Sequence, residues 1–92
     1  MRYEFKPSFE RSIKTLSTPE IDEIKAACNG FLDLIDLQAK LPIGMGLKHL
    51  GDDFWEIRKG LKCRILFRWH KDAIEFILAG SHDSIKKFLR NC

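Results

Sequence analysis

The stretch 54-FWEIRKGLKCRILFRWHKDAIEFILAGSH-82 decides the fold of this chain. Its middle run alternates between apolar and charged residues with a period of two, as a half-buried β-strand does. One face of this strand is apolar and the other is positively charged. The apolar face comprises Leu61, Cys63, Ile65, Phe67 and Trp69, and the charged face comprises Lys62, Arg64 and Arg68.

The runs on either side of this strand alternate in the same way. Glu56 and Arg58 share the polar face of the preceding run. The apolar positions are Trp55 and Ile57 before the middle strand, and Ile74, Phe76 and Leu78 after it. We therefore predict a three-strand antiparallel meander, apolar on one face and basic on the other, that leads into His82.

Positive charge is concentrated in the window 58–71, which contains no Asp or Glu although the whole chain carries a net charge of only +3. A basic strand face attracts phosphate groups or an acidic partner. Taken alone, the pattern is explained better by a solvated sheet face than by a binding site. The positive residues are Arg58, Lys59, Lys62, Arg64, Arg68 and Lys71.

Length and composition predict a single α+β domain over residues 1–92, since 92 residues with 45% hydrophobic and 32% charged residues fit one core. No apolar run approaches the roughly 20 residues of a membrane span, and the start lacks a signal peptide, so we expect a cytoplasmic protein. The three cysteines form no CxxC motif, and the three histidines lack the spacing of a ligand pair. We therefore expect no metal and no other cofactor.

The first half of the chain predicts a strand over 2–6 followed by two helices. Pro7 suits the first turn of a short helix, and Thr18 is the predicted N-cap of a longer one. Asn29-Gly30 favours a kink or break in the second helix. The two helices form an αα-hairpin that must cover one face of the sheet, and the apolar loop 41–47 is expected to lie against the core. The apolar stripes comprise Phe9, Ile13 and Leu16, then Ile21, Ile24, Cys28, Phe31 and Ile35.

A last helix is predicted after Ser81, its expected N-cap, with Ile85, Phe88 and Leu89 packing on the sheet. His82 then lies at a helix N-terminus, where the dipole disfavours the charged imidazolium. This placement suits a general acid or base near neutral pH. By itself, however, a surface histidine in a first helical turn is the simpler interpretation.

Taken together, the β-α-α-β-β-β-α order, the LxxLG segment at 47–51, WEIR-x5-RILF at 55–67 and AGSHD at 79–83 resemble the RelE/ParE superfamily of type II toxins. AGSHD is most similar to the histidine-bearing mRNA interferases of the YoeB and YafQ type. The resemblance covers essentially the whole chain. It implies a small RelE-like fold, in which an antiparallel sheet is packed by an N-terminal αα-hairpin and a short C-terminal helix.

The resemblance also implies a function. Toxins of this family inhibit translation by cleaving mRNA without metal, usually on the ribosome, through attack of a ribose 2′-hydroxyl on the adjacent phosphate. This chemistry needs a base, an acid and cations around the phosphate. The implied partners are mRNA, the ribosome and a cognate antitoxin whose acidic side chains would meet the Arg58 and Arg64 face.

Residue by residue, the resemblance assigns roles to the basic and histidine positions. Arg64 matches the arginine of the family's strand motif and would hold the scissile phosphate. His82 matches the catalytic Arg or His after the last strand, and His49 lies near the loop histidine of the YafQ type, so both are acid–base candidates. Glu56 could act as a base, although an ion pair with Arg58 is the favoured reading. The substrate-binding candidates are Lys48, Arg58, Lys62, Arg68 and Phe88.

Three departures from the family pattern bear on activity. Cys63 replaces the aromatic residue before the strand arginine, and Leu78 replaces an additional arginine of the YafQ type. Phe88 stands at a tyrosine position, so it can stack on a base but cannot exchange a proton. Two alternatives therefore stay open, since one fold hosts several functions. They are a ParE-like inhibitor of DNA gyrase and an inactive homologue that only binds its antitoxin.

Overall fold

A computed structural model of the chain describes residues 2–36, 46–58 and 63–91. In these ranges the elements are β1 (Arg2–Phe5), α1 (Pro7–Ile13), α2 (Thr18–Asp36), β2 (Leu47–Gly51), β3 (Phe54–Ile57), β4 (Arg64–His70), β5 (Ala73–Gly80) and α3 (His82–Arg90). The predicted α+β class is confirmed. Most of the expected apolar loop 41–47 lies outside the described residues. No described helix is both long and apolar enough to cross a bilayer.

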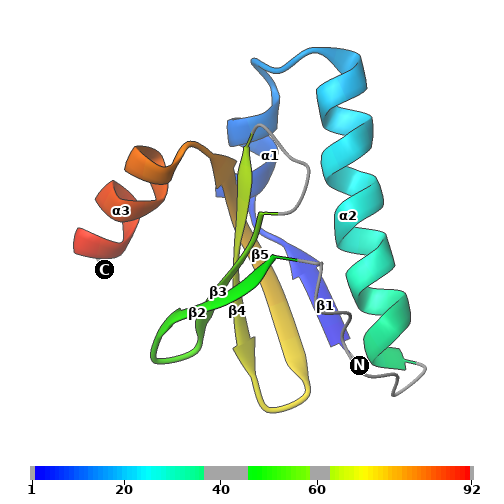
Figure 1. Cartoon of the computed structure of the whole chain (residues 1–92), viewed down its shortest axis with the longest axis vertical. Coiled ribbons are helices and arrows are strands. Elements are labelled where there is room, and N and C mark those ends of the chain that lie inside the picture. Colours follow the sequence, from blue (N-terminus) through cyan, green and yellow to red (C-terminus); the bar gives the residue numbers. More distant parts are fainter. Residues whose placement is uncertain (1, 37–45, 59–62, 92) are drawn as a thin grey trace.

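The strands form one five-stranded sheet in the order β1-β5-β4-β3-β2. The predicted antiparallel meander is confirmed as β3, β4 and β5. The sheet has two features that the sequence did not predict. The segment Leu47–Gly51 adds β2 beside β3, and β1 pairs with β5 in parallel, so the sheet is mixed. A parallel pair needs a long crossover, which here includes the αα-hairpin (Figure 1).

The main core lies between one face of the sheet and the helices α1 and α2. Aromatic rings dominate it: the Phe31 and Phe67 centroids are 4.8 Å apart, and those of Phe5 and Phe76 are 4.9 Å apart. This burial explains the apolar stripes of both helices. The buried residues are Phe9, Ile13, Ile24, Cys28, Phe31, Leu32, Ile57, Ile65, Phe67, Ile74, Phe76 and Ala79.

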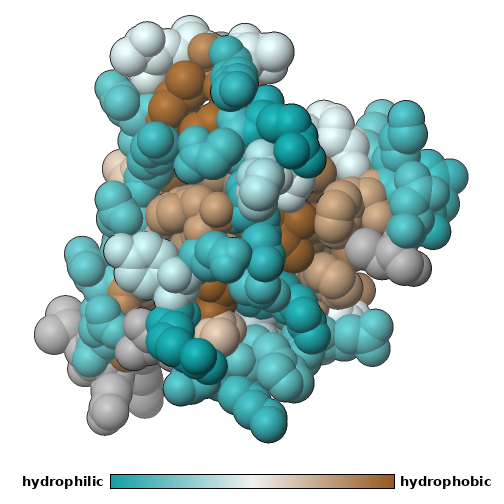
Figure 2. Space-filling model, turned by 180° about the vertical axis from the view of Figure 1, so that it is seen from behind, coloured by the Kyte–Doolittle hydropathy of each residue, from teal (hydrophilic) through white to brown (hydrophobic). Residues whose placement is uncertain are grey.

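The opposite face of the sheet is not uniformly basic, so that part of the sequence prediction is wrong. Leu66 lies on this face between Arg64 and Arg68 and is buried with Ile77 and Ile85. Ile85 belongs to α3, which lies on this side of the sheet next to the end of β5 (Figure 1). Seen from behind, apolar surface gathers where α3 joins the sheet (Figure 2). The second face therefore has an apolar centre with an arginine on either side.

A β-bulge in β5 explains why strict alternation failed there. Phe67 pairs with Phe76 and Leu66 pairs with Leu78, so Ile77 is an extra residue between two ladder positions. A bulge of this kind changes which face the following residues occupy. The period of two predicted that Leu78 shares a face with Phe76. In the structure, Leu78 instead packs against the cluster of Leu66, Ile77 and Ile85.

The N-cap of helix α2 is Ser17, not the predicted Thr18. The Ser17 hydroxyl accepts the backbone N–H of Glu20 at 3.4 Å and donates to the Glu20 carboxylate at 2.9 Å. The hydroxyl thus satisfies one free N–H of the first turn and also fixes the Glu20 side chain. The helix continues through Asn29-Gly30 to Asp36, so the expected break does not occur there. Packing of the apolar stripe outweighs the roughly 1 kcal/mol cost of one glycine.

We expect Ser17→Ala to lower the free energy of unfolding by about 0.5–2 kcal/mol, because it leaves an orphan N–H at the start of α2. Urea denaturation followed by circular dichroism measures this change. Thr18→Ala is the matched control, since it alters the neighbouring hydroxyl residue and should change stability by no more than about 0.5 kcal/mol. A larger effect for Thr18→Ala would contradict the assignment of the cap.

Candidate functional site

Arg64 and His82 meet where β4 begins and α3 starts. Arg64 lies opposite Gly80 in the β4–β5 ladder, two positions before His82. Its Nη1 donates a hydrogen bond to His82 Nδ1 at 2.5 Å. The helix start is fixed by Ser81, whose hydroxyl oxygen accepts the backbone N–H of Ser84 at 3.1 Å. The predicted cap thus holds His82 in the first turn of α3.

The chemistry of the two side chains sets the direction of this contact. A guanidinium has only donors, so His82 Nδ1 is the acceptor and carries no proton in this contact. Because His82 is exposed, the ring is accessible to a substrate. A cation and a neutral imidazole side by side are suited to an anion that also exchanges a proton.

Glu56 lies beneath Arg64. It is only 1% exposed, and its Oε1 is 3.8 Å from Arg64 Nη1. Glu56 is opposite Leu66 in the β3–β4 ladder, which places it on the same face as Arg64. The ion pair that the sequence suggested with Arg58 is therefore formed with Arg64. The sequence marked Glu56 as unusual, because it is the one charged residue in the apolar run FWEI. It could not identify Arg64 as the partner of Glu56, because that depends on the register of the strands.

Lys48 extends this site to a third strand, whereas His49 does not. Lys48 is opposite Glu56 in the β2–β3 ladder, so both side chains are on the face that carries Arg64. His49 is opposite Trp55 and packs on its ring, with 4.6 Å between centroids. Its Nε2 donates to the Asp52 carbonyl oxygen at 2.7 Å. The structure therefore places His49 on the other side of the sheet from Arg64.

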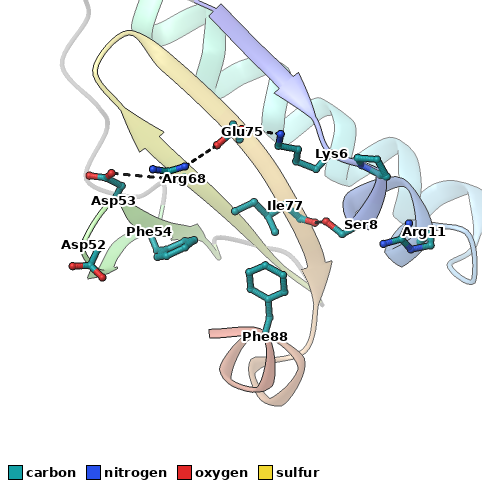
Figure 3. Close-up of a pocket in the computed structure, with 11 residues that line it drawn as sticks. Lys6, Ser8, Arg11, Asp52, Asp53, Phe54, Arg68, Glu75, Ile77 and Phe88 are labelled. Carbon is teal, nitrogen blue, oxygen red and sulfur yellow. Dashed lines mark hydrogen bonds and ion pairs between the residues drawn. The ribbon is translucent and has the colours of Figure 1, made fainter. Parts of the chain in front are cut away.

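A separate groove of about 960 Å³ contains two further candidates, Arg68 and Phe88 (Figure 3). It crosses the sheet between α1 and α3. Its apolar surface comes from Phe54, Ile77 and Phe88. Figure 3 shows Phe88 pointing from α3 toward Ile77. The structure thus separates these candidates from the Arg64 and His82 contact.

Two cations along this groove, Lys6 and Arg68, form ion pairs with acidic residues from other parts of the chain. Arg68 Nη1 is 3.4 Å from Glu75, and its Nε is 3.8 Å from Asp53. The hydrogen bond from Lys6 lowers the pKa of Glu75, and hydrogen bonds to Glu75 and Glu4 raise the pKa of Lys6. The window 58–71 looked uniformly basic because these acids lie outside it in sequence.

The other predicted substrate contacts are less defined. Arg58 is exposed directly after β3, with its backbone N–H bonded to the Gly46 carbonyl oxygen at 3.2 Å. Lys62 lies outside the described residues. The roles of both stay predictions.

The described cysteines do not supply a thiolate nucleophile. Burial raises the pKa of Cys28 to about 12. Burial, with a smaller contribution from Glu20, also raises the pKa of Cys63. Within residues 2–36, 46–58 and 63–91, no group of three His, Cys, Asp or Glu side chains is arranged to hold a metal ion.

Comparison with known proteins gives matches in structure but not in sequence. No protein-family model matches the chain, and no curated protein is significantly similar to it. The RelB–RelE antitoxin–toxin complex from Methanococcus jannaschii contains a chain that is 19% identical, with a TM-score of 0.67, over 91% of this chain and 95% of that one.

Two bacterial toxin structures match over a similar length. YafQ from E. coli strain BL21(DE3) is 11% identical with a TM-score of 0.65, over 92% of this chain and 98% of that one. A copper-bound L66S mutant toxin from Helicobacter pylori is 14% identical with a TM-score of 0.63, over 92% and 98%. Nearly the whole length of each neighbour is matched, which leaves no large element of these folds unaccounted for. The chain therefore has the fold of the RelE-like toxins.

Proposed function

We propose that this chain is the toxin of a type II toxin–antitoxin system and that it cleaves mRNA as a metal-independent endoribonuclease. The observation that carries the proposal is the Arg64 to His82 hydrogen bond of 2.5 Å, because it joins a phosphate-binding cation to a proton-transfer group. The RelE-like fold supports a toxin. The buried carboxylate of Glu56 and the neighbouring Lys48 complete a charged row across β2, β3 and β4.

In the proposed reaction, the ribose 2′-oxygen attacks the adjacent phosphorus and the bond from phosphorus to the 5′-oxygen breaks. The products are a 2′,3′-cyclic phosphate and a 5′-hydroxyl, whose oxygen takes its proton from solvent water as it leaves. Arg64 binds the non-bridging oxygens and stabilises the charge that develops on them. Arg64 stays beside Glu56 while the bound phosphate takes over the Nη1 donor, so His82 Nδ1 becomes free to accept the proton of the 2′-hydroxyl. Lys48 adds a positive charge on the same face.

The proposed partners follow from this site. An antitoxin whose acidic side chains cover Arg58 and Arg64 would block access to the phosphate-binding position. One structural neighbour is itself the toxin of an antitoxin–toxin complex, which supports a partner of this kind. The substrate, mRNA on the ribosome, would place the action of the protein in the cytoplasm.

The proposal is tested by inducing expression of the wild type beside His82→Ala and mapping cuts in an abundant translated mRNA by primer extension. We expect discrete cuts for the wild type, and a loss of about 10²- to 10⁴-fold in the variant, as for removal of a general acid or base. His70→Ala is the matched control. It removes an exposed histidine that pairs with Asp53 at 2.8 Å, away from Arg64.

The alternatives predict different outcomes of the same experiment. Growth arrest without mRNA cuts would contradict the endoribonuclease and favour a ParE-like inhibitor of DNA gyrase. The absence of arrest would indicate an inactive homologue that retains only antitoxin binding. Equal loss of cleavage in His70→Ala and His82→Ala would show that the effect comes from the fold and not from the site.

A further inference from the structure

We infer that Glu56 is a positioning residue whose buried carboxylate holds the Arg64 guanidinium against His82 and thereby selects the ring nitrogen that carries the proton. Its consequence for catalysis rests on the proposed function. The arrangement itself does not, because it is defined by three side chains of this chain. Glu56 does not touch the reacting atoms in this scheme.

The burial of Glu56 is the first reason for this inference. Its side chain is 2% exposed, compared with 26% for that of Arg64. Among the described residues, Glu56 is the only charged side chain that is buried. A carboxylate removed from water is strongly destabilising unless a cation or hydrogen-bond donors compensate it. Arg64 supplies such a cation at 3.8 Å. Because the buried carboxylate requires a nearby positive charge, it favours the position in which the guanidinium lies beside it.

Apolar residues around Glu56 and Arg64 strengthen the attraction between them. Leu66 lies directly across the ladder from Glu56 and is fully buried beneath Ile85 of α3 and Ile77. Apolar neighbours exclude water, and attraction between opposite charges is stronger where the local dielectric constant is low. Arg64 is thus held on its buried side by Glu56, while its outer side reaches His82 and solvent.

The atoms involved show how one arginine can serve two purposes. Both contacts use Nη1 of Arg64, which is 3.8 Å from Glu56 Oε1 and 2.5 Å from His82 Nδ1. In the part of the chain that the structure describes, the Nη2 and Nε donors therefore stay available to a phosphate. A guanidinium fork binds phosphate through two donors at once. Glu56 would thus orient the fork before the substrate arrives.

The same geometry fixes the histidine tautomer. With Arg64 donating to Nδ1, the neutral ring must place its proton on Nε2. Without the carboxylate, the guanidinium loses its buried anchor and can rotate away from the ring. His82 would then sample both tautomers, and the nitrogen that has to accept a proton in the proposed reaction would be partly protonated. We expect a loss of about 10- to 100-fold in kcat with little change in KM, as for misplacement of a catalytic group.

The experiment is long-range ¹H–¹⁵N correlation spectroscopy of the histidine rings at about pH 9, where imidazole is neutral. Wild type should show a single His82 tautomer with an unprotonated Nδ1. In Glu56→Gln, which keeps the side-chain volume, both His82 nitrogen signals should move toward the averaged position of mixed tautomers. His49 and His70 are internal references. Unchanged His82 signals in a folded Glu56→Gln variant would overturn the inference.

Glu75→Gln is the matched control, because it removes a carboxylate that also pairs with an arginine, Arg68 at 3.4 Å, on a neighbouring strand. It should leave the His82 signals in place. Glu56→Asp keeps the charge and should restore part of the wild-type spectrum. Arg64→Ala should reproduce the spectrum of Glu56→Gln. The double variant, with both substitutions, should show no further shift of the His82 nitrogen signals. An additional shift in the double variant would show that Glu56 does not act through Arg64.

These spectra separate the inference from the proposed function. They require no RNA, so they remain decisive if the wild type cleaves nothing. If the wild type cleaves mRNA but the His82 signals do not respond to Glu56→Gln, the endoribonuclease stands and the role of Glu56 is wrong. If Glu56→Gln fails to fold, Glu56→Asp and Arg64→Ala still test the link, since both must move the same His82 signals.

Discussion

Arg64→Ala should abolish toxicity while the protein stays folded. The substitution removes the cation that would bind the scissile phosphate, and loss of one such group costs about 10²- to 10³-fold in rate. The side chain of Arg64 is 26% exposed and belongs to neither core cluster. The measurements are growth after induction, primer extension on a translated mRNA, and thermal unfolding of the purified variant.

The removal of Arg64 also leaves Glu56 buried without its cation, so some destabilisation is expected. Arg64→Lys keeps a positive charge beside Glu56, so it should recover most of the lost stability. It should recover less of the activity, because lysine lacks the planar guanidinium that binds two phosphate oxygens. Arg2→Ala is a control for lost surface charge, because its side chain is 80% exposed and pairs with exposed Asp72. Full toxicity of a folded Arg64→Ala would refute the proposed site.

Phe76→Ala should lower the free energy of unfolding by about 3–5 kcal/mol. Phe76 is fully buried, and its ring centroid lies 4.9 Å from that of Phe5, 5.9 Å from Phe67 and 6.2 Å from Phe9. The substitution would leave a cavity where rings from β1, α1, β4 and β5 converge. Since small domains have a total stability of about 5–15 kcal/mol, this loss is a large fraction of the total. Equilibrium urea denaturation measures the loss.

Tyr3→Ala is the matched control for this aromatic truncation. Tyr3 contacts Phe5 at 6.0 Å but is 56% exposed. Its loss should cost no more than about 1 kcal/mol, because little apolar area returns to water. Similar losses for the two variants would contradict the placement of Phe76 at the centre of the core.

The sequence predicted the meander well because its alternation reflects burial directly. Prediction from the sequence failed where the alternation of apolar and polar residues is interrupted, and where a strand contains too few apolar residues to show it. The bulge at Ile77 inserts one residue into β5, and no periodicity argument places such an insertion in advance. Strand β2 was missed because LKHLG is short and poor in apolar residues. The parallel β1–β5 pair depends on how the helices cross the sheet, which is a tertiary property.

The candidate site was predicted in part. The resemblance brought Arg64 and His82 together as a proposal, and the structure shows the contact between their side chains. Sequence could not show that His49 faces away from Lys48, because this depends on β2 being a strand in register with Trp55. It also could not show that Asp53, in the turn before β3, and Glu75, in β5, both lie next to Arg68. In each case, residues distant in sequence become neighbours only through the ladder.

The parallel pairing of β1 with β5 has a consequence for how the chain folds. It joins Arg2 to Ala73 and Phe5 to Phe76, so one of the longest loops in the molecule must close before this pair forms. Contacts between residues so far apart slow folding. Until they form, the backbone amides of β5 next to Phe76 are an open, apolar sheet edge, which is a template for aggregation. Strand β1 therefore covers the edge of β5 and prevents it from pairing with another chain. Removal of residues 2–5 should increase aggregation during refolding.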